Sequence, residues 1–207
     1  MRTVPSTVFV VDDDPAVRQS LHWLIESVGL AVKTYETANE FLEQYNPNTQ
    51  GCLVLDVRMP GLSGLDLQER LASKHIEIPT IVITGHADVP MAIRAIKAGA
   101  LDFIEKPFND QVLLERIGQA LALDAKIRQS QHERAEIAAR LESLTARERE
   151  VMQMVVDGKA NKVIADQLGV SQKTVEVHRA NVMKKMQVDS LAELVRLALA
   201  AETLGPL

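Results

Sequence analysis

Four short stretches of this 207-residue sequence carry side chains that could do chemistry, and each stretch comes at the end of an apolar run. Asp12 and Asp13 follow the first such run, Asp56 follows another, and Thr84 and Lys106 come at the ends of two more. Carboxylate oxygens at this density suit Mg²⁺, which takes one or two protein carboxylates and keeps waters and phosphate oxygens as its other ligands. We therefore expect Mg²⁺-assisted phosphoryl transfer onto Asp56, with Mn²⁺ able to substitute.

The basic and hydroxyl side chains have complementary roles in this hypothesis. Lys106 would hold one phosphoryl oxygen as a point charge, and Thr84 would donate a hydrogen bond to another. Considered separately, Asp12 and Asp13 are typical of a solvated acidic turn, and Lys106 of an ordinary surface lysine. Their shared position at the ends of apolar runs favours a single site over these interpretations. The dipeptide Lys106-Pro107 indicates a bent backbone that aims the lysine, and a cis bond is compatible with it.

The elements that must position these residues are strands alternating with helices. Short β-branched apolar runs alternate with stretches of helical spacing between residues 7 and 108. This alternation predicts parallel βαβ units and an α/β fold with a five-stranded, doubly wound sheet covered on both faces. Ligands of such sheets bind at the carboxyl ends of the strands, where the chemical side chains fall. We expect the strands at residues 8–11, 31–35, 52–55, 80–84 and 102–104.

The second half of the sequence predicts helices only. Residues 110 to about 141 carry one apolar stripe and then a charged, glutamine-rich stretch, which predicts one long helix acting as a semi-rigid connector. Thr145 with Glu148, and Ser190 with Glu193, match the capping-box pattern and mark two helix starts. Gly169 indicates a tight turn between two further helices. Four short helices with such a turn form the helix-turn-helix motif.

Composition restricts the class of protein. The net charge is −5, and 46% hydrophobic with 25% charged residues excludes a largely disordered chain. The single cysteine, Cys52, lies in an apolar run and is interpreted as a buried hydrophobic residue, in agreement with a reducing cytoplasm. No stretch approaches the ~18 apolar residues of a membrane-spanning helix, and the first six residues lack a signal-peptide core. We expect a cytoplasmic protein with no membrane contact.

The motifs together resemble the receiver domain of two-component response regulators, which has a flavodoxin-like fold. The resemblance implies a receiver over residues 1–122, phosphorylated on Asp56 by a sensor histidine kinase. The match is specific because four separated motifs occur in the right order. They are Val10-Val-Asp-Asp13, Leu55-Asp-Val-Arg-Met-Pro-Gly61, Ile83-Thr-Gly-His86 and Asp102-Phe-Ile-Glu-Lys-Pro-Phe108.

The same resemblance implies roles for individual residues. Asp13, Asp56 and the main-chain carbonyl of Arg58 would bind Mg²⁺, and Asp12 would act largely through water. Thr84 and Phe103 would form a switch pair, in which Phe103 packs inward as Thr84 moves toward the phosphate. Phe103 stands where many relatives have tyrosine, and it is also compatible with a plain core aromatic residue.

Residues 144–201 are similar to the LuxR-type helix-turn-helix of the FixJ/NarL class. This implies a DNA-binding domain over residues 144–207, joined to the receiver by a helical linker over residues 123–143. The stretch Thr84 to Pro90 makes the receiver similar to FixJ in particular. The matching stretches of the second half are Leu144-Thr-Ala-Arg-Glu148, Asn161-Lys-Val-Ile-Ala165, Leu168-Gly-Val-Ser171 and Lys173-Thr-Val-Glu-Val-His-Arg179.

A helix over residues 172–186 is expected to enter the major groove of double-stranded DNA at promoter half-sites. By analogy with the family, Glu176, Val177 and Ala180 face the bases; Glu176 would accept from a cytosine amino group and Val177 would contact a thymine methyl group. Relatives often carry lysine near position 176, so the acid weakens non-specific binding. The expected phosphate contacts are Lys162, Lys173, Thr174, Arg179 and Lys184.

The function that we expect is phosphorylation-dependent transcriptional regulation, as an activator that works with RNA polymerase. Phosphorylation would add about 2 negative charges and shift the surface between residues 88 and 117. That surface would then form a homodimer or release the DNA-binding half. A Mg²⁺-dependent phosphatase is the competing enzyme hypothesis, but such enzymes usually carry a second acid where this chain has Arg58. An adaptor without DNA contact and a helical protein-binding module are two further hypotheses, and residues 144–201 argue against both.

Overall fold

The computed structural model describes residues 6–85 and 88–202. The chain divides into two compact units, Met1–Arg128 and Gln129–Leu207, and each is described by itself. Within the described residues, no helix combines the length and the apolar character that crossing a bilayer needs.

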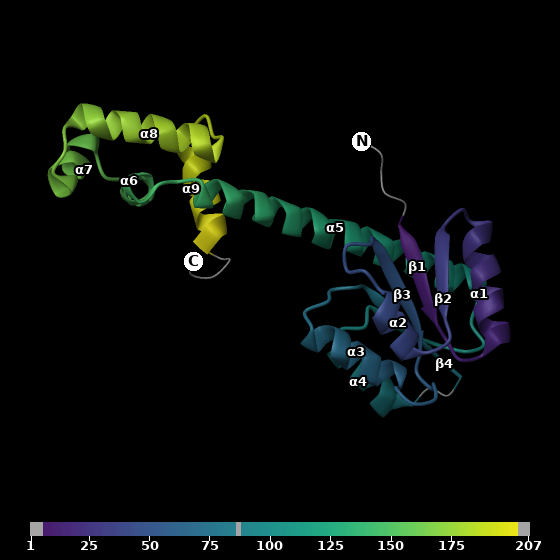
Figure 1. Cartoon of the computed structure of the whole chain (residues 1–207). Helices are drawn as coiled ribbons and strands as arrows, with labels where there is room; N and C mark the ends of the chain where they lie inside the picture. The colour runs from purple at the N-terminus through teal and green to yellow at the C-terminus, as the bar shows by residue number, and fades with distance from the viewer. Residues whose placement is uncertain (1–5, 86–87, 203–207) are drawn as a thin grey trace. The chain divides into compact units, whose positions relative to one another are not determined.

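The first unit is built on a parallel five-stranded sheet in the order β2-β1-β3-β4-β5 (Figure 1). All five strands predicted from the sequence are confirmed, with ends that differ by one residue at most. The strands are β1 (Thr7–Val11), β2 (Ala31–Tyr35), β3 (Gly51–Asp56), β4 (Thr80–Thr84) and β5 (Asp102–Glu105). The helices are α1 (Pro15–Ser27), α2 (Ala38–Gln44), α3 (Gly64–Ser73), α4 (Val89–Lys97) and α5 (Asp110–Glu142).

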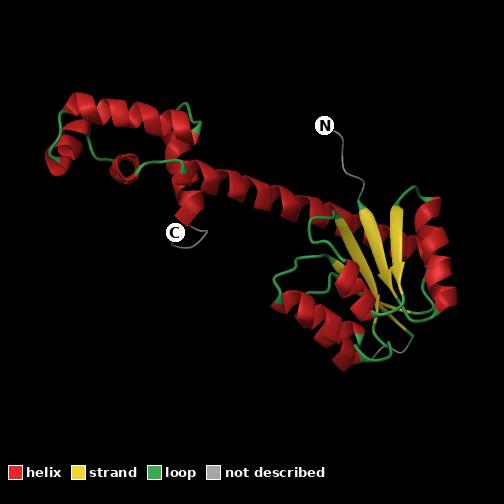
Figure 2. Ribbon diagram, in the orientation of Figure 1, coloured by secondary structure: helices red, strands yellow, loops and turns green. Residues whose placement is uncertain are grey.

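Helices cover both faces of this sheet (Figure 2), so β1, β3 and β4 are buried along their whole length. Alternate residues of β1 point to opposite faces. Val8 and Val10 join one core cluster with residues of α1 and α5. Phe9 and Val11 join another with residues of α2 and α3. The predicted doubly wound architecture is confirmed.

The second unit is a bundle of short helices with the local signals that the sequence predicted. The Thr145–Glu148 capping box is present in both directions, Gly169 has the left-handed backbone (φ +63°), and the Ser171 hydroxyl accepts from the Thr174 amide. At the last helix only half of the predicted capping box forms. The Ser190 hydroxyl accepts the Glu193 amide, but the Glu193 carboxylate accepts the amide of Asp189 and not that of Ser190. The helices are α6 (Ala146–Val156), α7 (Asn161–Leu168), α8 (Gln172–Met186) and α9 (Leu191–Glu202).

Helix α5 contributes to both cores, and its length confirms the long helix predicted for residues 110–141. Its first part packs Leu113 and Ile117 into the first unit, and its end packs Leu141 into the second. The first unit extends to Arg128, whereas the sequence analysis placed the linker over residues 123–143. The reason is a buried contact: Asp124 accepts the Gly51 amide at 2.9 Å and lies in an ion pair with Arg128.

Candidate functional site

The strand order brings the chemical side chains to one rim of the sheet. β1 and β3 pair in register up to Val11 and Leu55, so the residues that follow, Asp12 and Asp56, emerge beside each other. β4 and β5 pair up to their last residues, and Lys106 comes directly after β5. Three residues far apart in the sequence therefore meet at the carboxyl ends of the strands, as predicted.

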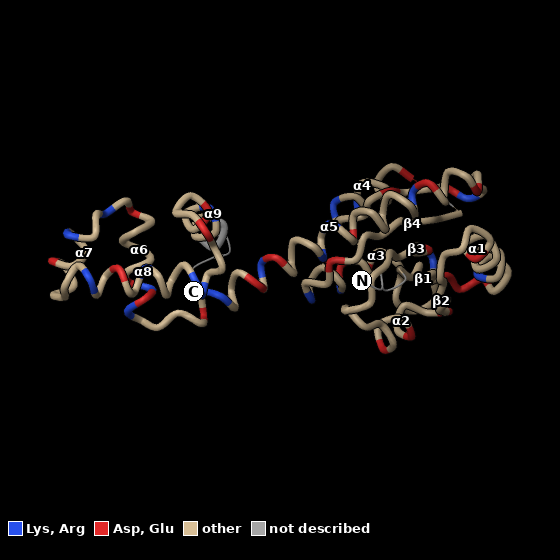
Figure 3. Tube along the Cα trace, turned by 90° about the horizontal axis from the view of Figure 1, so that it is seen from above, with Lys and Arg blue, Asp and Glu red and all other residues tan. Residues whose placement is uncertain are grey.

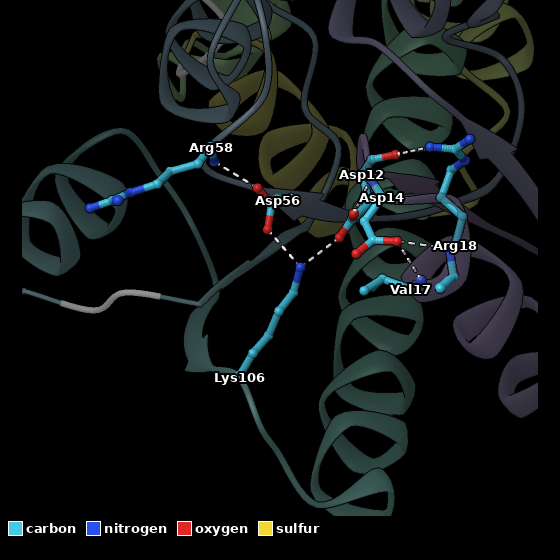
Figure 4. A network of polar contacts seen from close by, with 8 residues as sticks. Asp12, Asp14, Val17, Arg18, Asp56, Arg58 and Lys106 are labelled. Atoms are coloured by element: carbon cyan, nitrogen blue, oxygen red, sulfur yellow. Dashed lines mark hydrogen bonds and ion pairs between the residues drawn. The ribbon is translucent and has the colours of Figure 1, made fainter.

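The centre of this rim is a lysine shared by two carboxylates (Figure 4). Lys106 Nζ donates to Asp12 Oδ2 at 2.7 Å and to Asp56 Oδ1 at 2.7 Å. The remaining carboxylate oxygens accept main-chain amides: Asp56 Oδ2 from Arg58 at 2.6 Å, and Asp12 Oδ1 from Asp14 at 3.0 Å. Asp12 is 1% exposed and Asp56 is 5% exposed. Both carboxylates are thus held in fixed orientations by donors on two sides.

The electrostatics of the rim are unbalanced. Burial raises the pKa of Asp12, and this outweighs the lowering by Lys106. Burial also lowers the pKa of Lys106, but its hydrogen bonds to Asp12 and Asp56 outweigh that effect, so the net pKa is raised and the ammonium stays charged. One ammonium compensates only one of two buried carboxylates, and uncompensated buried charge is costly. A bound cation would remove this cost.

The donor set fits a magnesium ion. Within residues 6–85 and 88–202, no three His, Cys, Asp or Glu side chains gather closely enough to hold a metal by themselves. Mg²⁺ does not need such a cage, because it binds through one or two carboxylates and keeps several waters. The buried Asp12 and Asp56 and the half-buried Asp13, which follows Asp12 directly, would supply those carboxylates. The metal roles of Asp12, Asp13, Asp56 and the Arg58 carbonyl stay predictions.

The loop after β1 is held by contacts that fix Asp12. The Asp14 carboxylate accepts the Ala16 amide at 2.8 Å and caps α1, with Pro15 in the first turn, as is typical of helix starts. The Arg18 guanidinium donates to the Asp12 main-chain oxygen at 2.6 Å. No sequence pattern indicated this role of Arg18, because only the turn brings it back to Asp12.

A glycine that sequence reasoning missed stands beside the phosphoacceptor candidate. A Cβ on Gly64 would lie 2.0 Å from the Asp56 main-chain oxygen, so no other residue fits without moving the backbone. The Gly64 amide donates to the Val57 carbonyl at 3.0 Å and closes the loop after β3. A glycine directly after Ser63, the cap of α3, was the one signal that could have indicated it.

The predicted switch residues lie on the neighbouring strands. Thr84 ends β4 and is fully buried. Phe103 is half-buried in β5, pairs with Val82 in the sheet, and packs against a cluster that includes Ala95 of α4. The Lys106-Pro107 bond is cis, as the sequence allowed. His86, which belongs to one of the family motifs, lies outside the described residues.

The second predicted site is the outer face of α8, and Figure 3 marks the basic and acidic positions along the chain. The N-cap of α8 holds Thr174, whose hydroxyl lies 2.8 Å from that of Ser171. Arg179 departs from the expectation of an outward side chain: it is half-buried, and its Nη1 donates to Asn161 Oδ1 at 2.6 Å, which joins α7 to α8. The predicted DNA-contact residues that are exposed are Lys162 of α7 and, on α8, Lys173, Glu176, Val177, Ala180 and Lys184.

Comparisons with known families match both halves of the chain. Residues 8–118 match the response regulator receiver domain, and residues 142–198 match the bacterial regulatory proteins of the luxR family. The chain belongs to the response regulators that join a receiver domain to a LuxR-type DNA-binding domain. The predicted function class, a phosphorylation-dependent transcriptional regulator, is confirmed.

Within this class the chain is similar to FixJ. It is 49% identical to the transcriptional regulatory protein FixJ of Azorhizobium caulinodans, over 94% of this chain and 92% of that protein. The solved structure of the response regulator StyR matches with 48% identity and a TM-score of 0.90, covering 95% of this chain and 99% of that one. Full-length FixJ from B. japonicum matches with 44% identity and a TM-score of 0.59, covering 98% and 100%.

Proposed function

We propose that Asp56 accepts a phosphoryl group from a sensor histidine kinase and that this modification raises the DNA affinity of the C-terminal domain. The observation that carries the proposal is the rim where Asp12 and Asp56 share the single ammonium of Lys106. An excess of buried carboxylate at a strand end suits a divalent cation and an incoming phosphoryl group. The role is regulatory, because the chain itself is the molecule that is modified.

The side chains of the rim account for the transfer step. An Asp56 oxygen forms the new P–O bond as the bond between phosphorus and the kinase histidine breaks. Lys106, which already bonds Asp56 Oδ1 at 2.7 Å, holds a phosphoryl oxygen, and Thr84 donates to another. Mg²⁺, or Mn²⁺ in its place, offsets the charge on the transferring group when it is bound by Asp12, Asp13, Asp56 and the Arg58 carbonyl.

The response begins at the same rim and reaches α4. The acyl phosphate adds about 2 negative charges. Thr84 moves toward them and Phe103 packs inward, which shifts the surface between residues 88 and 117. Three apolar side chains of α4 are exposed on that surface, and this exposure supports assembly of the phosphorylated protein into a homodimer that buries them. They are Val89, Ile93 and Ile96.

The dimer presents two α8 helices to paired DNA half-sites. Glu176, Val177 and Ala180 contact base edges, and the exposed lysines neutralise phosphates. Arg179 can add a phosphate contact only with the guanidinium nitrogens that Asn161 leaves free. The bound protein acts in the cytoplasm as an activator through contact with RNA polymerase.

The proposal is tested by combining labelling with DNA binding in the full chain. Acetyl phosphate with Mg²⁺ should add the mass of one phosphoryl group to the wild type and none to Asp56→Asn. Fluorescence anisotropy on promoter DNA at fixed salt should show tighter binding only for the labelled wild type. Labelling of Asp56→Asn, or equal DNA affinity of labelled and unlabelled protein, would contradict the proposal. Lys173→Ala should weaken binding to all sequences and lower the salt slope by about 1.

A further inference from the structure

The amino-terminal rim of the sheet, away from Asp56, contains a cavity of about 460 Å³. Its walls come from the end of α3, the loop before β4, the turn after α4, and α5. This volume lies in the range of about 300–1,000 Å³ that is typical of small-molecule sites. The apolar wall residues are Leu71, Ile76, Ile78, Pro79, Leu123 and Ile127.

The cavity wall contains a buried acceptor that lacks a donor. Gln68 lines the cavity and is 4% exposed. Its Nε2 donates to the Ala95 carbonyl at 3.1 Å, but its Oε1 has no hydrogen-bond partner among the residues that the structure describes. Because an unpaired buried acceptor is costly, a donor supplied by a bound molecule would be favourable. Gln68 belongs to the cavity wall, so a molecule in the cavity is the natural source of that donor.

The side of the cavity formed by α5 is fixed before any ligand arrives. Asp124 is 2% exposed, accepts the Gly51 amide at 2.9 Å, and receives Arg128 Nε on both carboxylate oxygens at 3.0 and 2.9 Å. Arg128 Nη2 also donates to the carbonyls of Pro47 and Thr49. This clamp holds the turn of α5 that carries the apolar wall residues, and preformed walls lower the entropic cost of binding.

The remaining polar wall groups restrict the charge of a ligand. The titratable residues of the wall are the exposed Glu77 and His75, and among the described residues that line the cavity none is Lys or Arg. An anion would meet the Glu77 carboxylate, and a cation would bury its charge against apolar walls. The Thr80 hydroxyl already donates to the Ile78 carbonyl at 3.0 Å. A neutral molecule avoids both costs.

We propose that this cavity binds a small neutral molecule with an apolar ring body and one N–H or O–H donor, which pairs with Gln68 Oε1. The site is separate from the phosphoacceptor rim, so it does not rest on the proposed function. Its occupant contacts α3, the turn after α4 and the connector helix at once.

Indole and indene test this, because they share their size and only indole carries an N–H donor. Isothermal titration of the full-length protein should show indole binding roughly fivefold more tightly than indene. Gln68→Met removes the acceptor and should make the two affinities equal. Ala72→Trp fills the cavity from an exposed wall position and should abolish both. Ala122→Trp, an exposed alanine of α5 outside the wall, is the matched control and should bind as the wild type does.

The proposal is overturned if the wild type does not bind indole, or if it binds indole and indene with equal affinity. Indole binding that survives Ala72→Trp would place the ligand elsewhere and also overturn it. Asp56→Asn should bind indole normally, so failure here is distinguishable from failure of the phosphoacceptor assignment. Circular dichroism of each variant confirms that it is folded.

Discussion

Both units of this protein hold a half-buried lysine against buried carboxylates, but the number of carboxylates differs. In the receiver, Asp12 and Asp56 share Lys106. In the DNA-binding unit, a single carboxylate, that of Glu148, accepts from Lys185 at 2.6 Å, and it also accepts the Thr145 amide at 2.9 Å. The receiver group therefore has a surplus of negative charge, and the DNA-binding group is balanced.

The pKa values follow this difference. The hydrogen bond from Lys185, helped by the Thr145 amide, lowers the pKa of Glu148 to about 2. Burial raises the pKa of Asp12 despite Lys106. A balanced pair supports the fold, whereas a surplus of carboxylate leaves a position for a cation. The composition of a buried charge group, more than its presence, distinguishes a functional site from a structural one.

The largest expected effect comes from removing each lysine. Lys106→Met should destabilise the receiver by about 3 kcal/mol, because two buried carboxylates lose their counter-charge. Saturating Mg²⁺ should restore most of the stability that Lys106→Met loses. Lys185→Met should also lose stability, but Mg²⁺ should not restore it. Urea unfolding followed by the fluorescence of Trp23, the only tryptophan, reports on the receiver, and circular dichroism follows the rest. Equal Mg²⁺ responses of the two variants would break the comparison.

A second balanced group, the Asp124–Arg128 clamp, should behave like Glu148. Asp124→Asn should cost the receiver roughly 2 kcal/mol, because the half-buried Arg128 guanidinium loses its charged partner. It should also speed amide exchange of residues 120–128 in the connector helix, with no Mg²⁺ dependence. Hydrogen exchange with mass spectrometry measures both. Unchanged exchange in this segment would show that the clamp does not hold the helix.

The acid response of Glu148 has a defined sign. Since its folded pKa lies near 2, below its ordinary value of 4.5, ionised Glu148 stabilises the DNA-binding unit above pH 4.5. That contribution is lost as the pH falls through 2. Glu148→Gln should cost roughly 2 kcal/mol at neutral pH and flatten the stability profile between these values. Exchange protection of residues 146–186, measured against pH, tests this, and a parallel profile in the variant would refute it.

Asp12→Asn should have the smallest effect and the opposite sign. Without Mg²⁺ the variant receiver should be more stable by roughly 1 kcal/mol, because burial disfavours the charged carboxylate. With Mg²⁺ the gain should disappear, because the wild type binds the ion more tightly. Tryptophan-detected unfolding with and without the ion decides this. Destabilisation in the absence of Mg²⁺ would show that the rim carries no surplus charge.

The sheet and the rim were predictable because their signals are local. Apolar runs defined the strands, and parallel pairing then required Asp12, Asp56 and Lys106 to meet at the carboxyl ends. Capping residues and Gly169 likewise defined the short helices of the second unit.

The features that escaped prediction depend on contacts between distant segments. Gly64 is required only because α3 starts against the Asp56 carbonyl. The sequence analysis gave Asp124 and Arg128 no role, because their contacts depend on the distant Gly51, whose amide donates to Asp124. The hydrogen bond from Arg179 of α8 to Asn161 of α7 likewise joins two helices, and the DNA contact of Arg179 stays a prediction.

The central claim, a divalent cation at the receiver rim, is tested most directly with Mn²⁺ as a paramagnetic probe. Substoichiometric Mn²⁺ should broaden the amide signals of residues 12–14 and 56–58 in ¹⁵N spectra of the full chain, and excess Mg²⁺ should restore them. The signals around Glu148 and Asp124 should not change. Broadening centred on either of those residues, or none at the rim, would contradict the account.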